Sequence, residues 1–185
     1  MRPEFPAIIS WGNFVNGDYV SPRGKRDCVT LSNPADNEQI IAVVPISSLE
    51  DAEGAVLAAR RAFDEGPWPK ISTKERVRIL HKFADLILQN SEFLGTIEAY
   101  NVGKLYKECI DHEVPRAAEN IRFFARAIEQ WGDKAFSGSA RFLDKSVQTK
   151  SFTMRHPVGV SALIVPWNSP LMLATWKIGP CLACG

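Results

Sequence analysis

The sequence lacks the features that mark membrane, secreted and nucleic-acid-binding proteins. It contains no run of about 18 apolar residues, so nothing in it predicts a membrane span. No apolar stretch of signal-peptide length follows Met1, and the cytoplasm is therefore the expected compartment. Its 22 basic and 21 acidic side chains nearly cancel, which gives no reason to expect nucleic acid as a partner. The four cysteines are expected to be free thiols in that compartment.

The glycine-rich and nucleophile motifs of several enzyme classes are missing too. No G-x-G-x-x-G follows the apolar run 160–165, and no G-x-x-x-x-G-K-[ST] occurs anywhere in the sequence. Cys181 and Cys184 have the spacing of zinc and redox motifs. Their nominal further ligands, Cys109 and His112, are distant in sequence, so no metal site is expected. No G-x-S-x-G elbow accompanies any of the three histidines, which are His81, His112 and His156.

The sequence does have a globular composition and local signals for short strands near its start. Hydrophobic residues make up 45% and charged residues 23%, as in folded domains. Asn16 and Gly17 lie between apolar pairs and predict a two-residue hairpin, because both residues tolerate positive φ. The β-branched run 39–44 predicts a further strand, which Pro45 ends.

Four helices are predicted after these strands. Ser48 and Ser72, each followed three residues later by an acidic residue, begin the first two. Asn90 or Ser91 caps the third, which ends near Gly103. The fourth carries an apolar face nearly five turns long, made of Val114, Ala117, Ile121, Phe124, Ile128 and Trp131.

The C-terminal part of the sequence combines strand, loop and helix signals. Residues 138–145 look like a loop or edge segment, and 147–155 like an exposed strand. The apolar run 160–165 is typical of a buried parallel strand, and residues 171–184 are predicted to be a helix. A strand, loop and helix in this order form the first βα unit of a Rossmann-like doubly wound sheet. Such a unit needs a following parallel strand, and because none remains in the sequence, we expect a truncated chain.

These patterns together predict an α/β fold in four parts. We divide the chain into N-terminal strands and turns (1–45), a helical block (46–135), an exposed strand or linker (136–155) and the incomplete start of a dinucleotide-binding sheet (156–185). Open α/β sheets bind ligands beyond the carboxyl ends of their strands. The loop that follows the run 160–165 is therefore the first place to look for a site.

That loop is Pro166-Trp167-Asn168-Ser169-Pro170, and Asn168 is its most chemically suggestive residue. An asparagine amide can donate a hydrogen bond to an oxyanion that develops during a reaction, and the two prolines would stiffen its position. The same asparagine could equally well cap the helix 171–184. The residues alone leave these two roles open.

The stretch around this loop resembles the aldehyde dehydrogenase superfamily, most specifically through Pro166-Trp167-Asn168. Weaker matches occur in the family's order, at Asn16-Gly17, at Asn33-Pro34-Ala35 and at Gly103-Lys104. The segment 114–124 is similar to one branch of the family, which oxidises hydroxymuconic-type semialdehydes from aromatic breakdown.

The resemblance implies oxidation of a small-molecule aldehyde to an acid with NAD or NADP, NAD being favoured. In the family a cysteine thiolate adds to the aldehyde, and hydride then passes to the nicotinamide. Asn168 would donate its amide to the resulting oxyanion, and Lys177 stands at a position near the active site. The implied cofactor contacts are Ile164, Val165, Pro166 and Trp167. The implied substrate-lining residues are Ser169, Leu173 and Trp176.

The resemblance also implies that essential parts lie outside these 185 residues. The family's nucleophilic cysteine, its glutamate base and its G-x-T-x-x-G cofactor loop all follow the Pro-Trp-Asn stretch at a distance, and none of the four cysteines here matches the nucleophile's setting. We therefore expect the N-terminal fragment of a homo-oligomeric enzyme, a dimer or a tetramer, inactive by itself. The alternative is a non-catalytic truncated subunit that acts as an assembly or regulatory partner.

Overall fold

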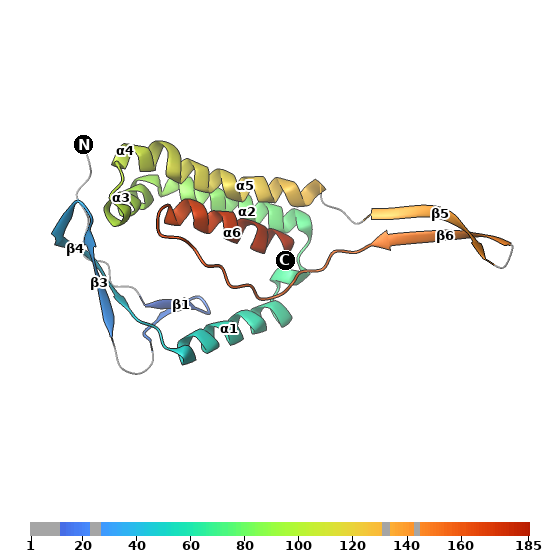
Figure 1. The fold of residues 1–185 in the computed structure, drawn as a ribbon, viewed down its shortest axis with the longest axis horizontal. Helices are drawn as coiled ribbons and strands as arrows, with labels where there is room; N and C mark the ends of the chain where they lie inside the picture. Colours follow the sequence, from blue (N-terminus) through green and yellow to red (C-terminus); the bar gives the residue numbers. More distant parts are fainter. Residues whose placement is uncertain (1–11, 23–26, 131–133, 143–144) are drawn as a thin grey trace.

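A computed structural model describes residues 12–22, 27–130, 134–142 and 145–185 of the chain (Figure 1). Within these ranges the strands pair only as three separate two-stranded antiparallel sheets, and the helices form the main packed body. The chain is therefore of the mixed α/β class that the sequence predicts. No helix of the described ranges is long and apolar enough to cross a membrane.

The N-terminal strands form two hairpins. Strands β1 (Asn13–Val15) and β2 (Asp18–Val20) are joined at Asn16 and Gly17, whose φ angles are 55° and 86°. Both central residues thus take the positive φ that a two-residue turn of this kind requires, which confirms the predicted hairpin. The second hairpin pairs β3 (Cys28–Asn33) with β4 (Asp36–Pro45), and the predicted strand 39–44 lies within β4.

The first three helices begin at the predicted residues, and the third also ends where predicted, at Gly103. Helix α1 (Leu49–Asp64) starts with a complete capping box between Ser48 and Asp51, and a short 3₁₀ turn, η1 (Trp68–Lys70), follows it. Ser72 caps α2 (Thr73–Gln89) by accepting a hydrogen bond from the backbone N–H of Glu75 at 3.2 Å. Helix α3 (Ser91–Val102) ends at Gly103, whose φ of 77° is the left-handed conformation of a helix C-cap.

The long fourth helix begins earlier than the apolar pattern indicates. A single turn, α4 (Tyr106–Glu108), and a stretch of π-helix, η2 (Cys109–Glu113), lead directly into α5 (Val114–Gln130). Pro115 has no N–H, and its ring excludes the carbonyl four residues before it, so the preceding turn cannot close as a regular α-helix. The wider π-helical turn accommodates this proline without ending the helix. The C-terminal residues of the expected face, from Trp131 on, lie outside the described residues.

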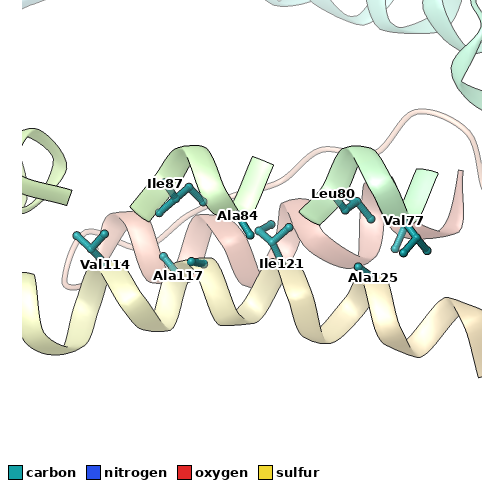
Figure 2. Close-up of a cluster of buried hydrophobic side chains, with 10 residues drawn as sticks. Val77, Leu80, Ala84, Ile87, Val114, Ala117, Ile121 and Ala125 are labelled. Carbon is teal, nitrogen blue, oxygen red and sulfur yellow. The ribbon is translucent and has the colours of Figure 1, made fainter. Parts of the chain in front are cut away.

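The hydrophobic core lies between α2, α5 and α6 (Pro170–Cys184). Figure 2 shows Leu80 and Ala84 of α2 facing Ile121 of α5, with α6 behind them. Leu80, Ala84 and Ile121 are at most 1% exposed. Alanines recur on the facing surfaces, at 84, 117, 118, 125 and 183, and their small side chains let the three helices approach closely. This three-helix body fixes the position of α6, and with it the loop that precedes α6.

The hairpin of β5 (Lys134–Phe142) and β6 (Lys145–Thr153) extends away from the helices (Figure 1). Its register pairs Lys134 with Thr153 and Phe142 with Lys145. Residues 138–142 are paired with β6 along their whole length and form an edge strand of this two-stranded sheet, so the edge alternative predicted for 138–145 is confirmed for them and the loop alternative is wrong. Their polar, glycine-containing sequence carries no strand signal, and the pairing with β6 supplies the missing stabilisation.

Residues 160–165 do not form the buried strand that their apolar run predicts. They follow an extended path between β6 and α6, with no strand assigned and with the side chain of Ile164 82% exposed. A strand exists only through hydrogen bonds to a neighbouring strand, and no described segment pairs with this one. The helix that follows forms as predicted, from Pro170 to Cys184.

Candidate active site

The candidate site lies where the extended segment turns into α6. Helix α6 begins with Pro170, a favoured first residue because its missing N–H has no helical partner there. Ser169 is the N-cap residue, and its carbonyl accepts the hydrogen bond from Leu173 N at 2.9 Å. Asn168 therefore lies one position before the cap. The structure does not support the alternative in which Asn168 caps this helix.

One side chain of the loop, that of Ser169, is buried, whereas those of Trp167 and Asn168 are exposed. Ser169 is 6% exposed, whereas Trp167 is 82% exposed. Asn168 is also exposed, and no hydrogen bond of its amide occurs among the described residues. The loop thus offers an amide with its donors available, one residue from a buried anchor.

That anchor is held by an ion pair beneath the start of α6. Lys104 Nζ pairs with Glu113 Oε1 and donates a hydrogen bond to Ser169 Oγ at 2.7 Å. Ser169 Oγ also lies 3.3 Å from Glu113 Oε1, within hydrogen-bond reach. Lys104 directly follows Gly103, whose left-handed turn ends α3 and packs against Pro34. The cap geometry of α3 therefore aims the lysine at the loop.

Glu98 holds the first turn of α6 from the other side. Its Oε2 accepts a hydrogen bond from Leu171 N at 3.3 Å, and the side chain is only 5% exposed. A carboxylate suits a helix N-terminus, where the unpaired N–H groups create a positive potential. Burial raises the pKa of Glu98, and the negative charge of Glu113 adds to that rise. Its second oxygen, Oε1, is buried without a hydrogen-bond partner among the described residues.

A buried asparagine on α5 fixes the next turn of α6. Asn120 Nδ2 donates to Met172 O and to Thr175 Oγ1, both at 3.1 Å. Thr175 Oγ1 in turn donates to Met172 O at 2.7 Å. These bonds set the rotation of α6 about its own axis, because they engage only the face that carries Met172 and Thr175.

The C-terminal end of α6 is held as well. Trp68 Nε1 donates to Leu182 O at 3.2 Å, and Arg76 Nη1 donates to Ala183 O at 3.1 Å. The guanidinium of Arg76 also stacks against the Trp68 ring at 5.8 Å. A cation near the last carbonyls complements the negative end of the helix. Both ends of α6 are thus bound to side chains of the helical block.

The structure places the predicted site residues in two groups. Ser169, Leu173, Trp176 and Lys177 belong to the cap and first two turns of α6, with Leu173 and Lys177 partly buried. Trp176 lines an open hollow of about 570 Å³ together with Arg116, Asn120 and two phenylalanines of α5. The predicted cofactor contacts form the second group, on the exposed segment Ile164, Val165, Pro166 and Trp167.

The buried cysteine near the candidate site, Cys109, is not poised as a nucleophile. Cys109 is fully buried, and burial with nearby carboxylates raises its pKa to about 11, so it stays a thiol near neutral pH. Within the described ranges no group of three or more His, Cys, Asp or Glu side chains could hold a metal ion. Sequence reasoning missed the roles of Glu98, Glu113 and Asn120. It found Lys104 only as part of a weak motif.

The short strands, the helical block and the loop with its free amide define a mixed α/β protein with a site at the start of α6. The sequence profile of the aldehyde dehydrogenase family matches residues 19–185. The match covers most of the chain, and the chain belongs to the aldehyde dehydrogenase family.

Curated and solved relatives agree with this assignment. The chain is 42% identical to a mitochondrial aldehyde dehydrogenase, family 2 member B4, of Arabidopsis thaliana, over 92% of the chain and 30% of that protein. It is 37% identical to the cytosolic 10-formyltetrahydrofolate dehydrogenase of Pongo abelii, over 93% of the chain and 18% of that protein. The NAD⁺ complex of an aldehyde dehydrogenase from Bacillus cereus superposes with a TM-score of 0.85 at 35% identity, over 95% of this chain and 34% of that one. The chain thus spans less than a third of the length of these two curated relatives.

Proposed function

We propose that this chain is the N-terminal part of an NAD(P)-dependent aldehyde dehydrogenase that oxidises an aldehyde to a carboxylic acid. The observation that carries the proposal is the exposed Asn168 amide in a Pro-Trp-Asn loop, within a chain that belongs to this family. The nucleophilic cysteine lies outside this chain in the proposal. The buried Cys109 thiol has neither the access nor the acidity for that role.

Asn168 would stabilise the charge that forms when a thiolate adds to the aldehyde carbonyl. The addition converts the carbonyl oxygen into an oxyanion, and an amide N–H that is already in place can donate to it. The exposed amide fits this role because none of the described side chains competes for its hydrogens. Lys177, two turns along α6, would lie near the same site.

The segment 164–167 would contact the dinucleotide, which accepts the hydride from the substrate when bound. Its backbone and its apolar side chains are exposed, as a surface for an adenine or nicotinamide ring requires. NAD is the favoured cofactor in this proposal, with NADP as the other choice. The NAD⁺ complex of the Bacillus cereus relative supports the use of a nicotinamide dinucleotide.

The substrate in this proposal is a semialdehyde of the muconic type, formed in aromatic catabolism, which carries a carboxylate besides its aldehyde. Arg116 shares the open hollow of α5 with Trp176, two turns of helix away from Ser169. The Arg116 guanidinium has no ion pair among the described residues, so it is available to a substrate carboxylate. The aromatic side chains Phe123 and Phe124 of the same hollow would contact the carbon chain.

A second candidate is a non-catalytic subunit that assembles with a complete one. The projecting hairpin β5–β6 favours it, because its edges and the exposed Phe136 and Phe152 offer a pairing surface. The same hairpin would serve a homo-oligomer, a dimer or a tetramer, of the complete enzyme. The cytoplasm remains the expected compartment, although the relatives include a mitochondrial and a cytosolic protein.

Kinetics of Asn168 variants test the proposed function in the complete enzyme that carries this segment. Asn168→Ala should lower kcat by about 10² to 10³, the loss usual for one oxyanion donor, with little change in KM for NAD. Asn168→Asp should lower it at least as much, because a carboxylate would face the developing negative charge. Asn101→Ala, which changes an exposed asparagine of α3, is the matched control and should keep the wild-type kcat. A fully active Asn168→Asp enzyme would remove this role, and a complete enzyme without aldehyde-dependent NADH formation would remove the proposed function.

A further inference from the structure

We propose that the partly buried pair Lys104–Glu113 positions Asn168, and that the Ser169 hydroxyl is the link between them. The inference rests on the proposed function, and it adds three positioning residues to it. Its starting point is the contrast between neighbouring residues: Asn168 is exposed and makes no hydrogen bond to a described residue, whereas Ser169 is buried and hydrogen-bonded to the ion pair.

The loop needs an anchor at Ser169 because proline restrains only part of it. Pro166 and Pro170 fix their own φ angles. Ser169 has φ −150° and ψ 67°, and the ring of Pro170 excludes helical conformations of Ser169 without selecting this ψ. Its hydroxyl accepts from Lys104 Nζ at 2.7 Å and lies 3.3 Å from Glu113 Oε1. These two bonds fix the position of Ser169 and of the peptide bond that joins it to Asn168. They therefore fix the position of the Asn168 backbone, from which its side-chain amide extends.

The charges around the anchor make its lysine indispensable. Lys104 lies near two carboxylates, the buried Glu98 and the largely buried Glu113, and each of them has one oxygen without a hydrogen-bond partner among the described residues. Removal of the ammonium would leave two like charges close together in a poorly solvated place. The ammonium therefore pairs with Glu113 and keeps the hydroxyl of Ser169 turned inward.

This arrangement gives Ser169 a role other than lining the substrate tunnel. The hydroxyl is directed into the protein, toward Lys104 and toward Glu113 of η2, and its residue is 6% exposed. Its removal should act on the reaction through the placement of Asn168. A displacement of a catalytic group by about 1 Å can lower a rate by about 10².

The test is a double-mutant cycle in the complete enzyme. Ser169→Ala should lower kcat by about 10- to 100-fold, with KM for NAD unchanged within about two-fold. Ser169→Thr keeps the hydroxyl and should retain most of the activity. In the Asn168→Ala background, Ser169→Ala should have no further effect on kcat, because the amide that it positions is already gone. Lys104→Met should show the same dependence on Asn168.

The control is Ser72→Ala, which removes the hydroxyl of another helix N-cap, at α2. It should lower the melting temperature while kcat stays at the wild-type value, because α2 contributes no residue to the loop. Equal losses from Ser169→Ala in the wild-type and Asn168→Ala backgrounds would overturn the inference and leave the proposed function intact. A Ser169→Ala enzyme with wild-type kcat would do the same. A wild-type enzyme that oxidises no aldehyde would overturn both.

Discussion

Gly179 of α6 packs against the ring of Phe124 of α5, and Gly179→Ala measures how tightly the two helices pack. A Cβ atom at this position would lie 2.6 Å from Phe124 Cδ2. The ring would have to retreat by about 0.8 Å to reach ordinary contact, and it already packs edge-on against Phe123. Overpacking of this kind costs about 1–3 kcal/mol. The alanine itself would favour the helix by about 1 kcal/mol, so the net change should be between nearly neutral and about 2 kcal/mol destabilising.

Gly54→Ala is the matched control, because Gly54 is also a mid-helix glycine but has no atom within 4 Å of the place that a Cβ would take. At this position only the higher helix propensity of alanine over glycine acts, and the variant should be about 0.5–1 kcal/mol more stable than wild type. The difference between the two variants combines the contact with Phe124 and the crowding of the new Cβ against the ring of Pro180, the next residue in α6, and should be at least about 1–3 kcal/mol.

Thermal unfolding followed by far-UV circular dichroism measures this difference. In a chain of this size, each kcal/mol shifts the melting temperature by about 2–4 °C. In the double variant Gly179→Ala with Phe124→Leu, the smaller side chain should restore part of the loss. Equal stabilisation by Gly179→Ala and Gly54→Ala would refute the reasoning, since it would show that α6 moves away from α5 at no cost.

Two further predictions concern charged groups near α6. The raised pKa of Glu98 means that the native state binds its proton more strongly than the unfolded chain, so the free energy of unfolding falls as pH rises from the ordinary carboxyl range through that raised value. Glu98→Gln should therefore raise the melting temperature relative to wild type more at pH 8 than at pH 4, and a pH-independent difference would contradict the burial argument. Arg116→Gln should raise KM for a semialdehyde that carries a carboxylate by about 10-fold, from the loss of one charged hydrogen bond, while KM for a neutral aldehyde of equal length stays constant. Equal changes for both substrates in steady-state kinetics would remove Arg116 from substrate selection.

Features fixed by neighbours in sequence could be predicted, and those fixed by distant contacts could not. The capping box at Ser48 and the turn at Asn16 and Gly17 depend on residues within three positions, and both occur as predicted. The strand at 138–142 depends on pairing with β6, which its own composition does not reveal. At residues 160–165 the composition predicts a strand, but no strand forms because no described segment pairs with them.

The candidate site shows the same division. The Pro-Trp-Asn loop could be found from sequence, because proline and asparagine in this order are distinctive within a short window. The residues that hold it come from elsewhere: Lys104 and Glu113 are 65 and 56 positions before Ser169. An ion pair withdrawn from solvent leaves no periodic pattern, since lysine and glutamate are equally common on solvated helix faces. Only the folded arrangement shows which of the charged residues lie inside.

The binding of both ends of α6 has a mechanical consequence. A 15-residue α-helix is about 22 Å long and resists changes in length, so it acts as a rigid spacer between its two ends. Trp68 and Arg76 donate hydrogen bonds to the C-terminal end of α6. Glu98 and the cap at Ser169 hold its N-terminal end. A displacement of the η1 turn along the helix axis would therefore be passed along α6 toward the cap at Ser169 and the neighbouring Asn168. Substitutions at Trp68 or Arg76 could therefore slow the reaction even though they leave the residues of the loop unchanged.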